Sequence, residues 1–331
     1  MKVFTQSTPG RYLKGVTSEE GEFLESFDLP ERIMNIEAGL RNAGCEIYPQ
    51  RDGADSQQIL CFMERIHAPS YLKHLRHYSN KLCDQEIFLT DEYYNKSLYP
   101  ETVLFEGIMA TALEAADIAA KAALGVAVGE VNTTYALCRP PGHHAGYNYL
   151  GGYCYLNNAM VSAYTLTQYG VDKVAIVDLD YHFGNGTSDI AQKHAAIHFS
   201  SIHSSKVEDY PHRNLKTERG SHHYFVGLDV IPTISEYLFQ LENIYHAVAR
   251  FGAQAVVVSM GYDTAINDPH GGWDFSPLCF EKIGQSLRQL NLPICIVQEG
   301  GYHFSSLAAC AEAFAHGFLN ASEQNNGTRK I

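Results

Sequence analysis

Short apolar runs rich in β-branched residues alternate with longer amphipathic stretches along most of the chain. The apolar runs predict strands at residues 135–140, 173–180, 195–203, 255–261 and 292–302. In the amphipathic stretches apolar residues recur at helical spacing, which predicts helices at 30–44, 104–125, 157–170, 233–252 and about 277–290. Continuous apolar strands alternating with helices are typical of a parallel sheet covered on both faces. The sequence therefore predicts one α/β domain, residues 1–331, around a central, mainly parallel sheet.

Polar residues gather where the predicted strands end. PPGHHAG follows the first apolar run, DLDYH ends the second, SIH the third, MGYD the fourth, and QEGGY the fifth. Ligands of open α/β sheets bind outside the carboxyl ends of the strands. We therefore expect the active site at that edge of the sheet.

The segment 75–103 departs from this alternation. HYSNKLCDQEIFLTDEYYNKSLYPE is polar, aromatic and weakly periodic, which predicts a long loop. Loops of that length in compact domains tend to be functional, and we expect this one to serve specificity or oligomerisation.

Composition narrows the class of protein. Hydrophobic residues make up 45% of the chain, and no apolar run is long enough to span a bilayer. The start MKVFTQ lacks the features of a secretory signal, so we expect a cytoplasmic protein. Eight cysteines without paired spacing predict neither disulfides nor a cysteine-based zinc site. A net charge of −13 argues against nucleic acid and favours a cationic ligand.

Three residues at the strand ends have the character of metal ligands. Asp180 and His182 are two residues apart, so on an extended segment they would point to one side, and Asp263 could join them from another strand. Two carboxylates and one imidazole leave coordination positions open, as in catalytic zinc sites, although Fe²⁺ or Co²⁺ would also fit. A single Asp-x-His is more often a capped strand end, but five such strand ends together favour a metal site.

The remaining polar groups match the needs of amide hydrolysis. Attack of water on an amide requires a base for the water, an acid for the departing amine and a donor to the oxyanion. His143 and His144 would supply the base and the acid, and Tyr302 the donor. Asp178 would orient His143 and set its charge.

The motifs RPPGHHAG, GGYCYLNNA, VDLDYHFGNGT, SMGYDTAINDPHGG and EGGY, in this order, resemble those of the histone deacetylase superfamily. The residues of these motifs are most similar to those of bacterial acetylpolyamine amidohydrolases. The resemblance implies an arginase/deacetylase-like fold and zinc held by Asp180, His182 and Asp263. His143 and His144 match the family's tandem histidines, and Tyr302 matches its oxyanion-stabilising tyrosine.

The resemblance also implies sites around this centre. A structural monovalent cation, usually K⁺, would draw on Asp178, on the Asp180 and His182 carbonyls, and on Ser201 and Ile202. The substrate tunnel would include Gly152, Tyr153, Tyr210 and, near its gate, His270. The chain departs from the commoner pattern at Phe183, where many members carry a second histidine, and at Asn185, where many deacetylases have Asp. With the neutral Asn185 as its partner, His144 should have a lower pKa.

The acidic balance favours a small acetylated cationic amine, such as an acetylpolyamine, as substrate. Acidic residues lie in two loops: Glu19, Glu20, Glu22, Glu25, Asp84, Glu86, Asp91, Glu92 and Glu101. The resemblance further implies a homodimer formed through the 75–103 loop. Three alternatives stay open: a deacetylase of acetyl-lysine in proteins, a catalytically silent acyl-amine binder, and a manganese arginase-like hydrolase.

Overall fold

A computed structural model describes residues 1–6, 16–19, 22–50, 56–83, 86–88 and 102–320. Within these ranges nine strands form the central sheet in the order β10-β11-β9-β8-β12-β13-β7-β1-β4. All neighbouring strands are parallel except the short β10, which pairs antiparallel with β11. The nine are β1 (Lys2–Thr5), β4 (Glu46–Pro49), β7 (Thr133–Leu137), β8 (Val174–Asp178), β9 (Ile197–Ser204), β10 (Glu218–Arg219), β11 (His223–Leu228), β12 (Ala255–Met260) and β13 (Ile294–Gln298). Two small two-stranded antiparallel sheets lie outside this sheet: β2 (Val16–Glu19) with β3 (Glu22–Glu25), and β5 (Ile87–Phe88) with β6 (Leu104–Phe105).

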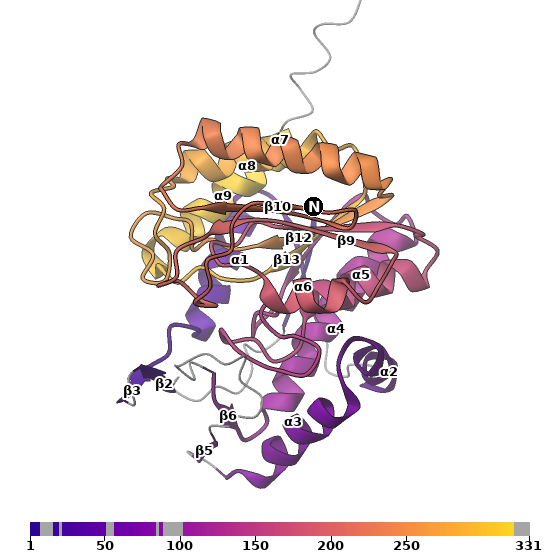
Figure 1. Ribbon diagram of the computed structural model, residues 1–331, viewed down its shortest axis with the longest axis vertical. Helices are drawn as coiled ribbons and strands as arrows, with labels where there is room; N and C mark the ends of the chain where they lie inside the picture. The colour runs from indigo at the N-terminus through magenta and orange to yellow at the C-terminus, as the bar shows by residue number, and fades with distance from the viewer. Residues whose placement is uncertain (7–15, 20–21, 51–55, 84–85, 89–101, 321–331) are drawn as a thin grey trace, which may run out of the picture.

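Helices cover both faces of the sheet (Figure 1). One face carries α1 (Pro30–Asn42), α7 (Ile234–Phe251), α8 (Pro277–Arg288) and α9 (Phe304–Asn320). The other carries α4 (Ile108–Ala127), α5 (Asn158–Gln168) and α6 (Asn185–Ala191), with α2 (Ser56–Ile66) and α3 (Pro69–Lys81) packed beyond them. The predicted α/β class, with its mainly parallel sheet and helices on both faces, is confirmed.

The central strands read as unbroken apolar runs because both of their faces are buried. In β12, Val257 packs into the core beneath α4 and α5, whereas Val256 and Val258 pack into the core beneath α7 and α8. Every residue of β8, β12 and β13 is buried. Such strands leave no exposed position for a polar side chain until they end, which is why the polar residues of the site follow them.

The 75–103 segment differs from the prediction. Residues 75–81 are the last turns of α3, which begins at Pro69 and buries Tyr71, Leu72 and Leu75. Polar residues outnumber apolar ones in this helix, and Pro69 rather than a polar cap begins it, so it lacks the apolar content of the helices that were predicted. Residues 84–85 and 89–101 lie outside the described residues, as does Glu20; for Glu19, Glu22 and Glu25 only the backbone is described.

Candidate active site

The two carboxylates and the imidazole of the predicted metal site converge. β8 ends at Asp178, so Asp180 and His182 lie in the bend that follows it, not on an extended segment. His182 Nδ1 lies 3.2 Å from Asp180 Oδ1 and 3.1 Å from Asp263 Oδ2. One ligand atom from each of the three residues lies within 4.8 Å of the others. The bend thus brings together ligands that a straight strand was expected to align.

The backbone approaches these two carboxylates closely at two glycines, Gly261 and Gly300. A Cβ on Gly261 would fall 2.3 Å from Asp180 Oδ2, and a Cβ on Gly300 would fall 2.5 Å from Asp263 Oδ2. The Gly300 N–H also donates to Asp180 Oδ2 at 2.8 Å. Only residues without a side chain let the backbone approach Asp180 and Asp263 this closely.

The charge of the cluster suits a cation. Both carboxylates are fully buried. Burial and the neighbouring Asp180 raise the pKa of Asp263 to about 8, because two carboxylates this close resist ionising together. A divalent ion would relieve that repulsion, and two oxygens with one imidazole nitrogen are a donor set that zinc accepts. The residues therefore fit a bound metal.

His143 and His144 stand beside this cluster with different partners. His143 Nδ1 lies 3.0 Å from Asp178 Oδ2, and its Nε2 is 3.7 Å from Asp180 Oδ1. Burial opposes its protonation, but Asp180 and Asp178 outweigh burial and raise the pKa of His143 to about 10. His144 Nδ1 lies 2.7 Å from Asn185 Oδ1. Burial and the neighbouring His143 hold the pKa of His144 well below its ordinary value.

Tyr302 is held by groups that the sequence analysis did not identify. Its ring lies 4.5 Å from the guanidinium of Arg32, a fully buried residue of α1. Its backbone N–H donates to Asp268 at 2.6 Å. Burial keeps the pKa of the Tyr302 hydroxyl well above its ordinary value, so this hydroxyl remains a donor.

The residues predicted for the tunnel surround the same centre. The Tyr210 ring packs edge-on against His144 at 4.5 Å, and a Cβ on Gly152 would fall 2.2 Å from the His144 ring. Tyr153 Oη lies 3.3 Å from His270 Nε2, and its ring is 5.7 Å from Tyr302. Tyr210 and Gly152 thus border His144, and Tyr153 and His270 border Tyr302.

Of the residues predicted for the monovalent cation, Asp178, Ser201 and Ile202 lie on adjoining strands, and Asp180 and His182 lie in the bend after β8. Asp178 of β8 is the register partner of Ser201 in β9, and Ile202 follows it. The Ser201 hydroxyl lies 2.9 Å from His203 Nδ1. Phe183, where many members carry a histidine, packs against the rings of His203 and Phe225.

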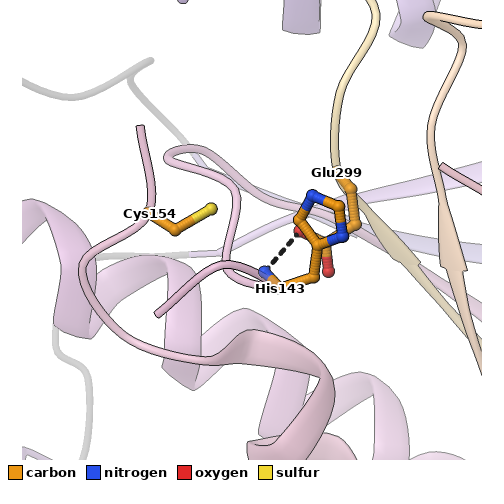
Figure 2. A group of neighbouring side chains, drawn as sticks. All are labelled: His143, Cys154 and Glu299. Carbon is orange, nitrogen blue, oxygen red and sulfur yellow. Dashed lines mark hydrogen bonds between the residues drawn. The ribbon is translucent and has the colours of Figure 1, made fainter. Parts of the chain in front are cut away.

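Sequence reasoning also missed Glu299. It lies in the quoted EGGY motif, yet its role was not predicted. His143, Cys154 and Glu299 form a second group whose ligand atoms lie within 4.8 Å of one another (Figure 2). The one sequence signal was an acidic residue at the end of an apolar strand. Arg32 gave no signal at all, because the partners that tie it to the site, the Gly301 and Glu299 carbonyls, lie more than 260 positions away.

A parallel sheet with a buried acid–histidine cluster at the carboxyl ends of its strands defines an α/β protein with a candidate metal site. The histone deacetylase domain model matches residues 28–318, and the chain belongs to that family. The acetylpolyamine amidohydrolase of Mycoplana ramosa is 36% identical over 202 residues, which are 59% of this chain and 56% of that protein. Histone deacetylase 15 of Arabidopsis thaliana is 30% identical over 310 residues, which are 89% of this chain and 53% of that protein.

The fold extends over nearly the whole chain. The crystal structure of an acetylpolyamine aminohydrolase from Burkholderia pseudomallei superposes with a TM-score of 0.86 at 24% identity, covering 97% of this chain and 99% of that one. The matched region is only about half the length of the curated relatives in sequence. No helix among the described residues has the length and apolar character to cross a bilayer.

Proposed function

We propose that this protein is a metal-dependent amidohydrolase that removes the acetyl group from an acetylated amine. The observation that carries the proposal is the convergence of three elements at one edge of the sheet. These elements are the acid–histidine cluster, the tandem histidines and the buried Tyr302. They combine a cation site, proton-transfer groups and an oxyanion donor, which are the groups that amide hydrolysis requires.

Asp180, His182 and Asp263 would hold the metal, for which Zn²⁺ is the first choice and Fe²⁺ or Co²⁺ the others. A bound ion of this kind polarises a carbonyl and lowers the pKa of water. Asp178, Ser201 and Ile202, with the carbonyls of Asp180 and His182, would hold a structural K⁺.

The tandem histidines would move the protons. Sequence reasoning assigned the base to His143 and the acid to His144. The partners of the two rings favour the reverse: His144, with its Nδ1 proton directed to Asn185, can accept a proton at Nε2. His143, between two carboxylates, is the ring that holds a proton and can donate it to the departing amine.

Tyr302 would stabilise the oxyanion. Its hydroxyl stays protonated at neutral pH, and Arg32 and Asp268 hold the ring and the backbone of this residue. Because the Tyr302 hydroxyl is already in place before the reaction, no free energy is spent on moving it as negative charge develops on the carbonyl oxygen of the substrate.

A small cationic acetylated amine is the substrate we favour. The relative from Mycoplana is an acetylpolyamine amidohydrolase, the chain carries a net charge of −13, and aromatic rings line the site. Aromatic faces and acidic loops both attract ammonium groups. A homodimer formed through the 75–103 segment, which would narrow the approach to the site, belongs to the same proposal.

Deacetylation of acetyl-lysine in proteins is the second candidate. It is favoured by the similarity to Arabidopsis histone deacetylase 15, which extends over 89% of this chain. A panel of N-acetylputrescine, N-acetylcadaverine, N8-acetylspermidine and acetyl-lysine peptides separates the two. We expect higher kcat/KM on the acetylated polyamines; equal or higher values on long peptides would favour the second candidate, and no turnover of any substrate would leave a silent binder.

A further inference from the structure

Glu299 is a fully buried carboxylate whose hydrogen-bond partners are neutral. It follows β13 directly, and no ion pair with it forms among the described residues. Its Oε2 accepts from the N–H of Gly142 at 2.7 Å and from the N–H of His143 at 3.1 Å. Its Oε1 accepts from the Ser259 hydroxyl at 3.2 Å. A buried carboxylate costs less free energy when each oxygen accepts hydrogen bonds, and here one oxygen holds two consecutive peptide groups.

Those two peptide groups belong to the turn that carries the tandem histidines. On its other side the turn packs against α5, where a Cβ on Gly142 would fall 2.4 Å from the Asn158 nitrogen. The turn is therefore clamped between the start of a helix and the Glu299 carboxylate. Figure 2 shows the His143 N–H bonded to Glu299, with the His143 ring next to the carboxylate.

The backbone of Glu299 holds the opposite half of the site. Its carbonyl accepts from Arg32 Nη2 at 2.5 Å. Arg32 also donates from Nε to the Gly301 carbonyl at 2.6 Å and lies 4.5 Å from the Tyr302 ring. The side chain of Glu299 thus fixes the histidines while its main chain fixes the segment that leads to Tyr302.

We propose that Glu299 is a positioning residue that sets the distance between the tandem histidines and Tyr302 by accepting the Gly142 and His143 N–H groups. This inference rests on the proposed amidohydrolase function. It requires the acceptor oxygen more than the negative charge of Glu299, because both bonded peptide groups are neutral and Asp180 and Asp178 act more strongly than Glu299 on the charge of His143. The residue would act through His143 and His144 and would not touch the substrate.

The alternative use of this cluster is a second metal site formed by His143, Cys154 and Glu299. The contacts argue against it. His143 Nδ1 is directed to Asp178, and the Cys154 thiol lies 3.3 Å from the Gly152 carbonyl, to which it donates. Burial raises the pKa of that thiol well above its ordinary value, so it stays protonated and is a poor ligand.

Three variants of the full chain loaded with zinc test the proposal. Glu299→Gln removes the charge but keeps an oxygen that can accept both N–H groups, and its amide can donate to Ser259. Glu299→Ala removes the acceptor. Ser259→Ala removes only the contact to Oε1 and is the matched control. For each variant kcat and KM on N-acetylputrescine, zinc per chain and the melting temperature are measured.

We expect Glu299→Gln and Ser259→Ala to keep kcat within about threefold of the wild type. In both variants residue 299 can still accept hydrogen bonds from the Gly142 and His143 N–H groups. Glu299→Ala should lower kcat by about 30- to 100-fold with little change in KM or zinc content, as expected for misplaced catalytic groups.

Three results would overturn the proposal: normal kcat in Glu299→Ala, a loss in Glu299→Gln as large as in Glu299→Ala, or loss of zinc from the glutamate variants. If Glu299→Ala does not fold, a Glu299→Gln variant that folds but has lost about 30-fold or more in kcat is sufficient to reject it. Wild-type protein that hydrolyses no acetylated amine would instead refute the proposed function.

Discussion

Gly300 offers a sharp test of the metal site, because its backbone lies directly beneath the acid pair. A Cβ added there would lie 2.5 Å from Asp263 Oδ2 and 2.6 Å from Asp180 Oδ2. Ordinary contact begins near 3.4 Å, so Gly300→Ala must displace the carboxylates or the backbone by about 0.9 Å. The backbone cannot retreat without breaking the 2.8 Å bond from the Gly300 N–H to Asp180.

A displacement of this size is large for a metal site. Ligand distances hold to within about 0.2 Å in well-formed sites, so we expect zinc affinity to fall by about 100-fold. The turnover that remains at saturating zinc should fall by a similar factor of about 100, because the groups around the ion move with it. Zinc competition with a chromogenic chelator gives the affinity, and acetate release gives the turnover.

Gly125→Ala is the matched control. Gly125 lies in α4, and the nearest atom to an added Cβ is Thr134 Cγ2 at 3.6 Å, an ordinary contact. This variant should bind zinc as the wild type does and gain about 0.5–1 kcal/mol in the free energy of unfolding. A Gly300→Ala protein with wild-type zinc affinity and turnover would refute the claim that Asp180 and Asp263 bind a metal.

Three further predictions follow from the site and from one buried histidine. Asp263→Ala should lose both bound zinc and acetate release, measured by elemental analysis and by turnover. Tyr302→Phe should retain zinc but lose about 100-fold or more in kcat, and normal turnover would exclude the oxyanion role. Burial lowers the pKa of His67 to about 4, below its ordinary value of 6.5. Because the unfolded chain takes up that proton first, His67 should remove about 2 kcal/mol of stability as the pH falls from 7 to 5. Urea unfolding at both pH values should show that the free energy of unfolding depends less on pH in His67→Gln than in the wild type. An unchanged pH dependence would contradict the lowered pKa of His67.

The central strands could be predicted from the sequence because burial on both faces leaves a continuous apolar signal. The strand predicted at 255–261 is β12 (Ala255–Met260), and the one predicted at 173–180 ends two residues early, at Asp178. The peripheral strand β1 was missed because its burial alternates over only four residues. The helices α2 and α3 were also not predicted, although apolar residues recur at helical spacing in both.

The site could be anticipated where its residues follow strands. Asp180, His182 and Asp263 end apolar runs, so the rule that parallel strands present ligands at their carboxyl ends brought them together. Arg32 could not be found in this way, because it reaches the site only when α1 packs near the end of β13. The roles of Glu299 depend on contacts 156 and 157 positions away, which no local pattern encodes.

The most direct test of the central claim is the metal dependence of acetate release from N-acetylputrescine. The purified protein is assayed as prepared, after removal of metal by a chelator, and after stepwise return of Zn²⁺. Acetate release should disappear with the metal and return in full with about one zinc per chain, since one open site holds one catalytic ion. Acetate release that survives complete removal of metal would contradict the account.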